Sequence, residues 1–471
     1  MKYQSTRGRF GGLSFEEALL SGYTPDGGIL VPETVPQISK ETLQSWKSLK
    51  YPDLVKNISR LYIDESEMKT DVLNELIDRA FSSFTHPDVA VLNPLKDGLN
   101  ILELFHGTTL AFKDLALSCI GQFLEHFLSK RKKHMTIVVG TSGDTGSAAI
   151  EAVKGLKWVD LIVLLPRGRC ERIQELQMTT VIADNIHVFR VDGSSDDMDM
   201  VIKPLFMDAA FSSAHNLCSI NSINWARIMA QIAHYFYAYL QVSPDCDSEV
   251  EIVIPTGACG NVTSGCFAQC MGLPIKMICA TNANDIVYRT LMNGDFSVNP
   301  AVIQTLAPAM DIQIPYNMER IFYLFTEGDS RRVKSMLQEF ESKKGIQIEE
   351  GLHKKIASRI GTWCVTDDAI QSSMLKCWEA SGYLLCPHTA TAADYCYANH
   401  STDIPRVCLA TASPVKFVKA VTSAGLTPQV PDAIKKLYDA PTKYVDMNLK
   451  DDWSKMLRDT ILKVSKRVQE M

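Results

Sequence analysis

The chain has 471 residues, of which 46% are hydrophobic and 22% charged, and its formal net charge is -6. This length predicts roughly two to four domains. The mild acidity argues against a general nucleic-acid-binding surface, and no run of about 18 apolar residues predicts a membrane span. The 13 cysteines show no CxxC pair and no zinc-type spacing with histidine, so we expect reduced thiols and no metal site.

The N-terminal part of the chain predicts a mainly helical unit. Apolar residues recur at helical spacing between Asp71 and Phe84. The first 15 residues lack acids and carry basic side chains, as transit peptides do, but a turn-rich segment at 24–32 follows closely. We therefore expect a cytoplasmic protein, with a mitochondrial location as the alternative.

From about residue 100 onward, short apolar runs alternate with helical stretches. This alternation predicts an α/β fold with parallel-rich sheets that are covered by helices on both faces. Ligands bind beyond the carboxyl ends of such strands, so the loops that follow them should carry the chemistry. A helix is expected at 147–153, and the predicted strands are 136–139, 161–165, 186–191, 250–254, 275–279 and 406–409.

Lys113 is the first candidate for chemistry. It lies between the apolar side chains of Phe112 and Leu115. Burial disfavours an ammonium ion and makes the neutral amine a better nucleophile toward an aldehyde. For a lone lysine a surface position near a helix start would be the preferred interpretation, and only the surrounding motif favours catalysis.

The loop at 140–146 lies between a predicted strand and a predicted helix. Its backbone N–H groups and hydroxyls would converge on a carboxylate or phosphate at a helix N-terminus, and a simple turn is the alternative. It is not a Walker A loop, because no Gly-Lys-Ser/Thr ending follows, and Asp144 replaces the second glycine of a nucleophile elbow. The candidate substrate-binding residues are Ser142, Gly143, Asp144 and Thr145.

Two further strand ends are candidates for ligand contacts. The loop at 255–261 contains glycines that let the backbone approach an anion closely. The Cys259 thiol could have a lowered pKa there, but a structural thiol is the preferred interpretation. Thr411 places a hydroxyl at the end of the strand at 406–409, where it meets a ligand or simply ends the strand. The candidate phosphate-binding residues are Gly257, Ala258, Cys259, Gly260 and Asn261.

Together these segments resemble threonine synthases of the longer, fungal and enterobacterial type. The resemblance runs from Asp26 to about Phe417. The segment 106–114 resembles the family's lysine motif for pyridoxal 5′-phosphate (PLP), with Thr108 where proline is usual. The segment 142–149 resembles the substrate loop. Further matches lie at 221–227, 280–282, 284–285 and 308–312.

The resemblance implies PLP-dependent fold type II, the tryptophan synthase β-like fold. It implies that Lys113 carries PLP as a Schiff base and moves protons at the substrate carbons, that residues 257–261 hold the cofactor phosphate, and that Thr411 faces the pyridine nitrogen. It also implies three domains, with approximate boundaries. They are an N-terminal domain at 1–93, a large PLP-binding domain at 94–130 and 223–471, and a smaller substrate-loop domain at 131–222.

Departures from the family pattern lie near the cofactor. Ala258 and Cys259 replace a common Asn-Phe pair, and Ser413 replaces a histidine. These changes resemble the vertebrate threonine synthase-like protein 2 group. That resemblance implies a catabolic phospho-lyase that converts O-phosphohomoserine and O-phosphothreonine to 2-oxobutyrate, ammonia and phosphate. Arg167 and Arg169 are candidates for the leaving phosphate, with surface arginines as the equal alternative.

Two other functions stay open at this point. A true threonine synthase shares the early steps and differs only in adding water at the β-carbon. A non-catalytic binding protein with the same fold is the second alternative, and the retention of Lys113, Asp144 and Thr411 argues against it. We expect phosphorylated amino acids as the small-molecule partners and no nucleic acid or membrane, and the oligomeric state is open.

Overall fold

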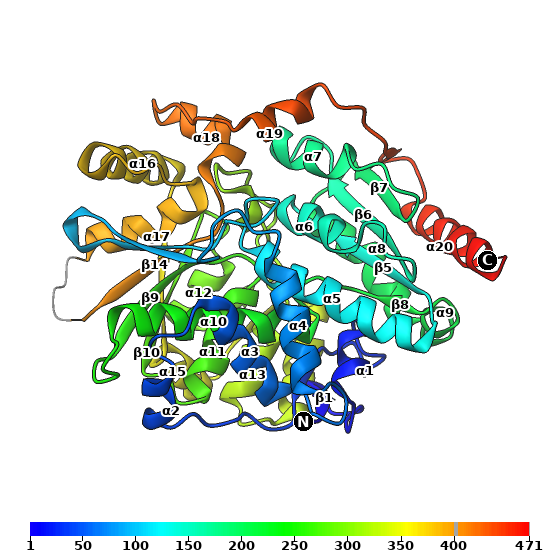
Figure 1. Cartoon of the computed structure of the whole chain (residues 1–471), viewed down its shortest axis with the longest axis horizontal. Helices are drawn as coiled ribbons and strands as arrows, with labels where there is room; N and C mark the ends of the chain where they lie inside the picture. The colour runs from blue at the N-terminus through cyan, green and yellow to red at the C-terminus, as the bar shows by residue number, and fades with distance from the viewer. Residues whose placement is uncertain (400–403, 471) are drawn as a thin grey trace.

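A computed structural model describes residues 1–399 and 404–470, and two parallel-rich sheets lie side by side in it (Figure 1). The first sheet has six strands, and only β3 runs antiparallel to its neighbour. In spatial order they are β13 (Ile360–Cys364), β10 (Ile275–Thr281), β9 (Val250–Pro255), β14 (Arg406–Ala410), β4 (Asn100–Glu103) and β3 (Val91–Pro94).

The second sheet has five strands, all parallel. Its order is β15 (Val445–Met447), β7 (Ile186–Val191), β6 (Val159–Pro166), β5 (Met135–Gly140) and β8 (Leu217–Cys218). Every residue of β6 and β9 is buried, as expected for strands that are covered on both faces. The six predicted strands are all present, within two residues of the predicted bounds, so the predicted α/β class is confirmed.

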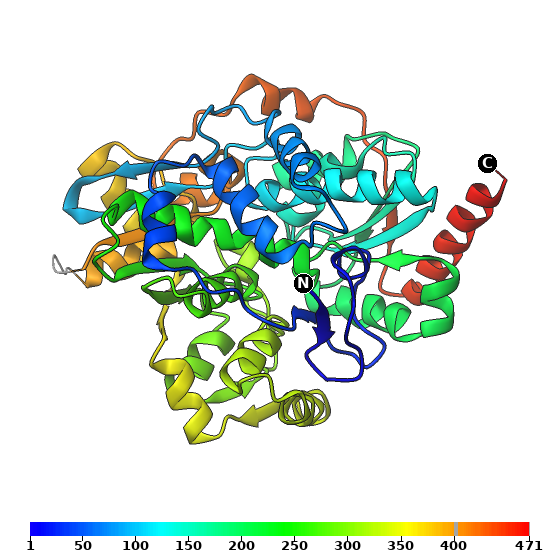
Figure 2. The same ribbon diagram turned by 60° about the horizontal axis from the view of Figure 1, so that its bottom comes forward.

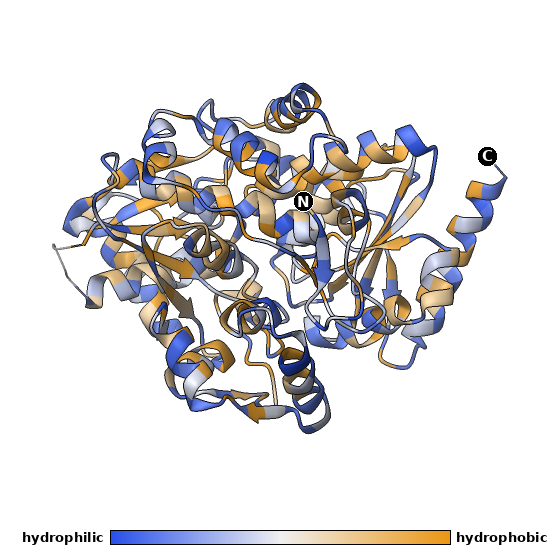
Figure 3. Ribbon diagram, turned by 90° about the horizontal axis from the view of Figure 1, so that it is seen from below, coloured by the Kyte–Doolittle hydropathy of each residue, from blue (hydrophilic) through white to orange (hydrophobic). Residues whose placement is uncertain are grey.

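Helices fill the space between and around the sheets. The central helix α10 (Trp225–Val242) is buried along all of 225–240, which is typical of a helix in the middle of a large core. The hydropathy colouring in Figure 3 shows apolar strands inside and polar helix faces outside. Other helices that border the sheets are α5 (Lys113–Arg131), α6 (Asp144–Val153), α7 (Arg172–Thr179), α8 (Ser195–Met207), α11 (Gly260–Cys270), α12 (Ile286–Asn293), α16 (Asp367–Ser381) and α17 (Pro387–Ala398).

The N-terminal region is mainly helical, as predicted, and packs on the central helices. α3 (Tyr51–Tyr62) contacts α10, and α4 (Thr70–Phe81) contacts α5. The Tyr51 hydroxyl lies 2.6 Å from Nδ1 of His234, inside this interface. The remaining elements at this end are β1 (Tyr3–Ser5), α1 (Phe15–Leu19), β2 (Leu30–Pro32) and α2 (Lys40–Ser45).

A smaller, mainly helical segment lies between β10 and β13 in the sequence and projects at the bottom of Figure 2. It places β11 (Asp295–Ser297) antiparallel to β12 (Gly345–Gln347). Within the described ranges, no helix is long and apolar enough to cross a membrane. The segment's helices are α13 (Met318–Phe325), α14 (Ser330–Lys343) and α15 (Glu350–Ala357).

The C-terminal segment differs from the predicted boundaries, which place all of residues 223–471 in the PLP-binding domain. β15 instead pairs with β7, and α20 (Trp453–Gln469) packs its Leu457 and Ile461 into the core beside β6. Figure 1 shows α20 at the edge of the five-stranded sheet. The physical reason is this buried apolar face, which the local sequence does not assign to either sheet. The connecting helices are α9 (Ala209–Ala214), α18 (Val418–Ser423) and α19 (Asp432–Lys435).

Candidate active site

The carboxyl ends of β5, β9 and β14 and the N-terminus of α5 meet at one cavity between the two sheets. Its volume is about 140 Å³. The structure therefore brings the candidate loops of both sheets together, as the parallel-strand rule predicts. Among the predicted residues, the cavity is lined by Lys113, Ser142, Thr145, Gly257, Ala258, Cys259, Gly260, Asn261 and Thr411.

Lys113 begins α5 and lies beside a buried ion pair. Its Nζ lies 3.3 Å from Oδ2 of Asp144, whose Oδ1 lies 2.7 Å from Nζ of Lys416. Burial lowers the pKa of the Lys113 amine; Asp144 opposes this shift, and the charge of Lys416 adds to it. Burial alone would raise the pKa of Asp144, but Lys416 and Lys113 outweigh it and hold that pKa well below its usual value.

The loop before Lys113 is held in shape by Asp114. The Asp114 carboxylate accepts hydrogen bonds from the backbone N–H and the hydroxyl of Thr109, at 2.8 and 2.6 Å. A Cβ at Gly107 would lie 2.4 Å from the Asp114 side chain, so only glycine fits there. Burial raises the Asp114 pKa to about 6. These contacts explain why the segment around Lys113 has a glycine at position 107 and an aspartate at position 114.

Residues 257–260 form a cradle for an anion at the N-terminus of α11. Within the described chain, none of their backbone N–H groups donates a hydrogen bond. The side-chain Nδ2 of Asn261 is buried and also lacks a partner, while its Oδ1 accepts from the Tyr235 hydroxyl at 2.8 Å. Unpaired donors at a helix N-terminus fit the phosphate of PLP.

Glycine is required in this cradle by close packing. A Cβ at Gly257 would lie 2.9 Å from the carbonyl oxygen of Ala309, and one at Gly260 would lie 2.8 Å from Cβ of Ser222. Cys259 takes a left-handed conformation, with φ of 61°. Burial raises the pKa of its thiol well above the usual value, which favours the structural interpretation of this cysteine.

Lys416 is a residue that the sequence analysis missed. It is fully buried, and its Nζ also lies 2.7 Å from the carbonyl oxygen of Thr109. Gln174 joins the same cluster, because its Nε2 donates to Asp144 Oδ1 at 2.7 Å. Lys416 follows the candidate strand end at Thr411 closely, and this proximity was the only signal in the sequence that could have found it.

Two other missed residues line the cavity. His388 accepts a hydrogen bond from the backbone N–H of Ala309 at Nε2, 3.1 Å away, and burial lowers its pKa to about 3, so the ring is neutral. Arg227 donates from Nη1 to the Ile220 carbonyl, while its buried Nε has no partner among the described residues. Burial lowers the Arg227 pKa to about 10. The signal for Arg227 was its place in the matched segment 221–227.

Of the two interpretations left open for Arg167 and Arg169, the structure favours surface arginines, because neither lines the cavity. Arg167 pairs with Asp192 at 3.1 Å, and Arg169 is exposed. The Arg167 guanidinium also lies 3.9 Å from Asp446 of β15, outside the cavity. Arg227 is the cavity-lining arginine that can meet a phosphate, since a guanidinium forms charge-assisted hydrogen bonds with phosphate oxygens.

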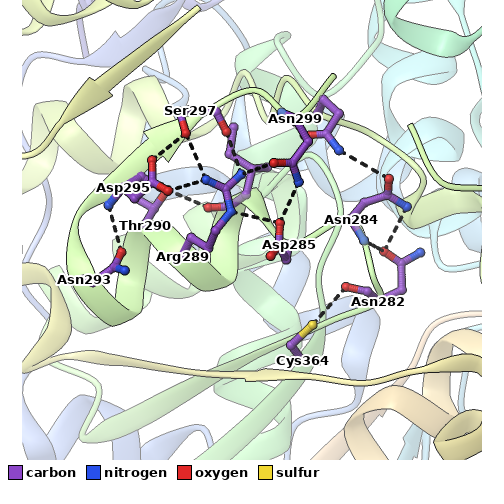
Figure 4. Close-up of polar contacts among 12 residues, drawn as sticks. Asn282, Asn284, Asp285, Arg289, Thr290, Asn293, Asp295, Ser297, Asn299 and Cys364 are labelled. Atoms are coloured by element: carbon purple, nitrogen blue, oxygen red, sulfur yellow. Dashed lines mark hydrogen bonds and ion pairs between the residues drawn. The ribbon is translucent and has the colours of Figure 1, made fainter. Parts of the chain in front are cut away.

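A polar network behind the cradle fixes the wall that contains Ala309. Asp311 accepts from Nδ2 of Asn282 at 2.8 Å and from the Thr305 hydroxyl at 2.7 Å. From Asn284 the network continues through Gln313 to Asn299, whose Nδ2 donates to Asp285 on the far side (Figure 4). The 305–311 segment is thus held against Gly257 by hydrogen bonds that lie outside the cavity.

The comparisons with known proteins agree with this geometry. Residues 2–81 match the family described as "Threonine synthase N terminus", residues 99–352 match "Pyridoxal-phosphate dependent enzyme", and residues 389–459 match "Threonine synthase, C-terminal". These three matches follow one another along the chain and confirm the resemblance that the motifs indicate.

Individual relatives cover nearly the whole chain. It is 53% identical to threonine synthase-like 2 of Rattus norvegicus, over 99% of this chain and 98% of that one. It is 38% identical to threonine synthase of Schizosaccharomyces pombe, over 90% of this chain and 89% of that one. The crystal structure of PLP-bound threonine synthase from Brucella melitensis has a TM-score of 0.90 at 35% identity, and 99% of both chains is covered. The chain therefore belongs to the threonine synthase family of fold type II enzymes, and its cofactor is PLP.

Proposed function

We propose that this PLP-dependent enzyme is a phospho-lyase. It eliminates phosphate from O-phosphohomoserine and O-phosphothreonine and releases 2-oxobutyrate and ammonia. The observation that carries the proposal is the wall beside the cradle. Ala258 ends in a methyl group, and the Cys259 side chain is part of the hydrophobic core, so neither can hold a water for addition at the substrate's β-carbon.

The residues of the cavity supply the parts that elimination needs. When bound, PLP withdraws electrons from the substrate's α-carbon. The Lys113 amine holds the cofactor, and once free it takes and returns protons at the substrate carbons, for which its lowered pKa suits it. Asp144 and Lys416 fix the position of that amine.

The remaining groups bind and orient. The hydroxyls of Ser142 and Thr145, with the N-terminus of α6, bind the substrate carboxylate. Thr411 offers a hydroxyl to the pyridine nitrogen, and Arg227 meets the leaving phosphate. A hydroxyl supports a protonated pyridine less well than a carboxylate would. Milder electron withdrawal by the ring suits elimination.

The test is product analysis with O-phosphohomoserine as the sole substrate. Phosphate matched by equal 2-oxobutyrate supports the lyase. Phosphate matched by threonine overturns it in favour of a threonine synthase, the alternative that the 38% identity to the Schizosaccharomyces pombe enzyme favours. The variant Lys113→Ala is the matched control, because it should release neither product and borohydride should fix no cofactor to it.

A further inference from the structure

A second cavity adjoins the active site on the side of α8. Its volume is also about 140 Å³. Apolar side chains of β11 and α14, such as Phe296 and Phe340, form one wall, and Arg7 and Lys203 lie on another. The four residues that line both cavities are Asp196, Asp199, Ile314 and Tyr316.

Asp199 lines both cavities, and the site described above gives it no role. Among the described residues, its carboxyl group forms no hydrogen bond and no ion pair. Its Oδ1 lies 3.6 Å from the point that a Cβ of Gly140 would occupy, so it reaches over the start of the substrate loop. Asp196 differs, because its Oδ2 accepts the backbone N–H of Gln313 at 3.1 Å.

The two carboxyl groups therefore have different environments. Burial and the charge of Asp196 raise the pKa of Asp199 to about 7, and Lys203 opposes the shift weakly. Burial raises the pKa of Asp196 as well, but its backbone hydrogen bonds oppose that shift. Backbone N–H groups favour the ionised form of Asp196, whereas Asp199 has no such donor. Two carboxyl groups in such unequal environments can differ in protonation, one ionised and the other protonated.

Tyr316 connects this pair to the candidate phosphate ligand. Burial and Asp199 raise the pKa of Tyr316 to about 12, while a hydrogen bond with Ser222 and the charge of Arg227 lower it. Tyr316, Asp199, Asp196 and Arg227 all line the active-site cavity. The other charged or titratable groups near Asp199, on α8 and across the second cavity, are Lys203, Arg7, Tyr23, Glu319, Glu341 and Lys344.

We propose that Asp199 is the acid that protonates the leaving phosphate; this inference rests on the proposed function. Lys113 takes a proton from the substrate carbon next to the one that bears the phosphate. The electron pair of that C–H bond forms the new C=C bond, and the C–O bond breaks with its pair on oxygen. The Asp199 carboxyl gives its proton to this oxygen, so hydrogen phosphate leaves, and Asp199 regains a proton from water through the second cavity.

The test compares two leaving groups on the same enzyme. Phosphate needs a proton on departure, whereas the chloride of 2-amino-4-chlorobutanoate does not. We expect Asp199→Asn to lower the ratio of phosphate to chloride elimination about 100-fold, the size of a general-acid contribution. An unchanged ratio in a variant that binds PLP normally overturns the role of Asp199.

The pH dependence of this ratio distinguishes a chemical role of Asp199 from an effect of its replacement on folding. In the wild type the ratio should fall as pH rises through about 7, where Asp199 loses its proton, and it should be flat in Asp199→Asn. The matched variant Asp196→Asn removes the neighbouring charge, so the fall should shift to lower pH. An unshifted fall in Asp196→Asn counts against the acid. If the wild type releases no phosphate, the proposed function fails. If it releases phosphate but Asp199→Asn has the same ratio of phosphate to chloride elimination, only this inference fails.

Discussion

Lys416 forms an ion pair with Asp144, 2.7 Å from Nζ to Oδ1, in which neither side chain is more than 2% exposed. The other oxygen of Asp144 faces Lys113 at 3.3 Å. One buried carboxylate thus faces two lysine side chains, in a site where charges interact strongly. Lys416 neutralises Asp144 and leaves Lys113 only partly compensated, which favours the neutral, nucleophilic amine.

Replacing Lys416 should therefore damage both the fold and the site. Lys416→Met leaves Asp144 buried with less compensation, and breaking such a pair costs about 3 kcal/mol of unfolding free energy. Chemical denaturation of the cofactor-free protein measures this loss. Lys419→Met, on an exposed side chain nearby, is the control and should cost less than about 0.5 kcal/mol. Equal stability of the two variants would contradict the buried pair.

Reconstitution with PLP should show the lowered pKa of Lys113. Only the neutral amine attacks an aldehyde, and its fraction rises as pH rises through its pKa. Burial and Lys416 lower that pKa from 10.5, so the rate of PLP incorporation into cofactor-free enzyme should reach half its maximum below pH 10.5. A model lysine amide, followed by absorbance in the same buffers, gives the reference curve. A midpoint equal to that of the model amine would refute the assignment.

Six strands of the two large sheets, and the loops after them, could be predicted from the sequence, because both depend on local signals. Continuous runs of valine, isoleucine and leucine mark buried parallel strands, and glycines mark the turns that follow. Lys113, Asp144 and the cradle at 257–261 lie in such loops or at the first residues of the helices that follow them. Their meeting at one cavity follows from the rule for parallel strand ends.

Other features depend on distant partners and left no local signal. Lys416 is buried only because Asp144 and the Thr109 carbonyl meet it. The strand β15 is short, and its Val445 is half exposed, so its pairing with β7 does not show as an apolar run. Arg167 follows a buried strand and looked suitable for phosphate, but Asp192 holds it outside the cavity.

Gly257 should tolerate no side chain, because the wall behind it is fixed. A Cβ there would meet the Ala309 carbonyl at 2.9 Å, and the Asp311 network prevents that segment from moving away. Gly257→Ala should raise the dissociation constant for PLP about 10-fold, equal to about 1.4 kcal/mol, in a fluorescence titration. Gly11→Ala, where the nearest atoms lie at 3.5 Å, is the control. Normal PLP affinity in Gly257→Ala would show that the cradle is wider than described.

The start of the five-stranded sheet contains a buried charge cluster far from the cavity. Asp160 is 1% exposed and lies 2.8 Å from Nε2 of both His134 and His187, and it also pairs with Arg467 of α20. Burial alone would raise the pKa of Asp160, but these partners outweigh burial and hold the pKa well below its usual value. Asp160 therefore joins α20 to the sheet that carries the substrate loop.

Asp160→Asn should lower the unfolding free energy by about 2 kcal/mol at pH 7, because it removes the buried charge that two partly exposed histidines and Arg467 contact. The pKa of Asp160 is lower in the folded protein than its unfolded value of 3.8, so its carboxylate stabilises the fold at pH values above 3.8. This stabilisation is lost as the pH falls toward the folded pKa. The difference between wild type and variant, measured by urea unfolding, should thus shrink below about pH 4. The exposed Asp439 gives a control, Asp439→Asn, that should match the wild type throughout. A difference that stays constant from pH 7 to pH 3 would mean that packing, rather than charge, holds α20 in place.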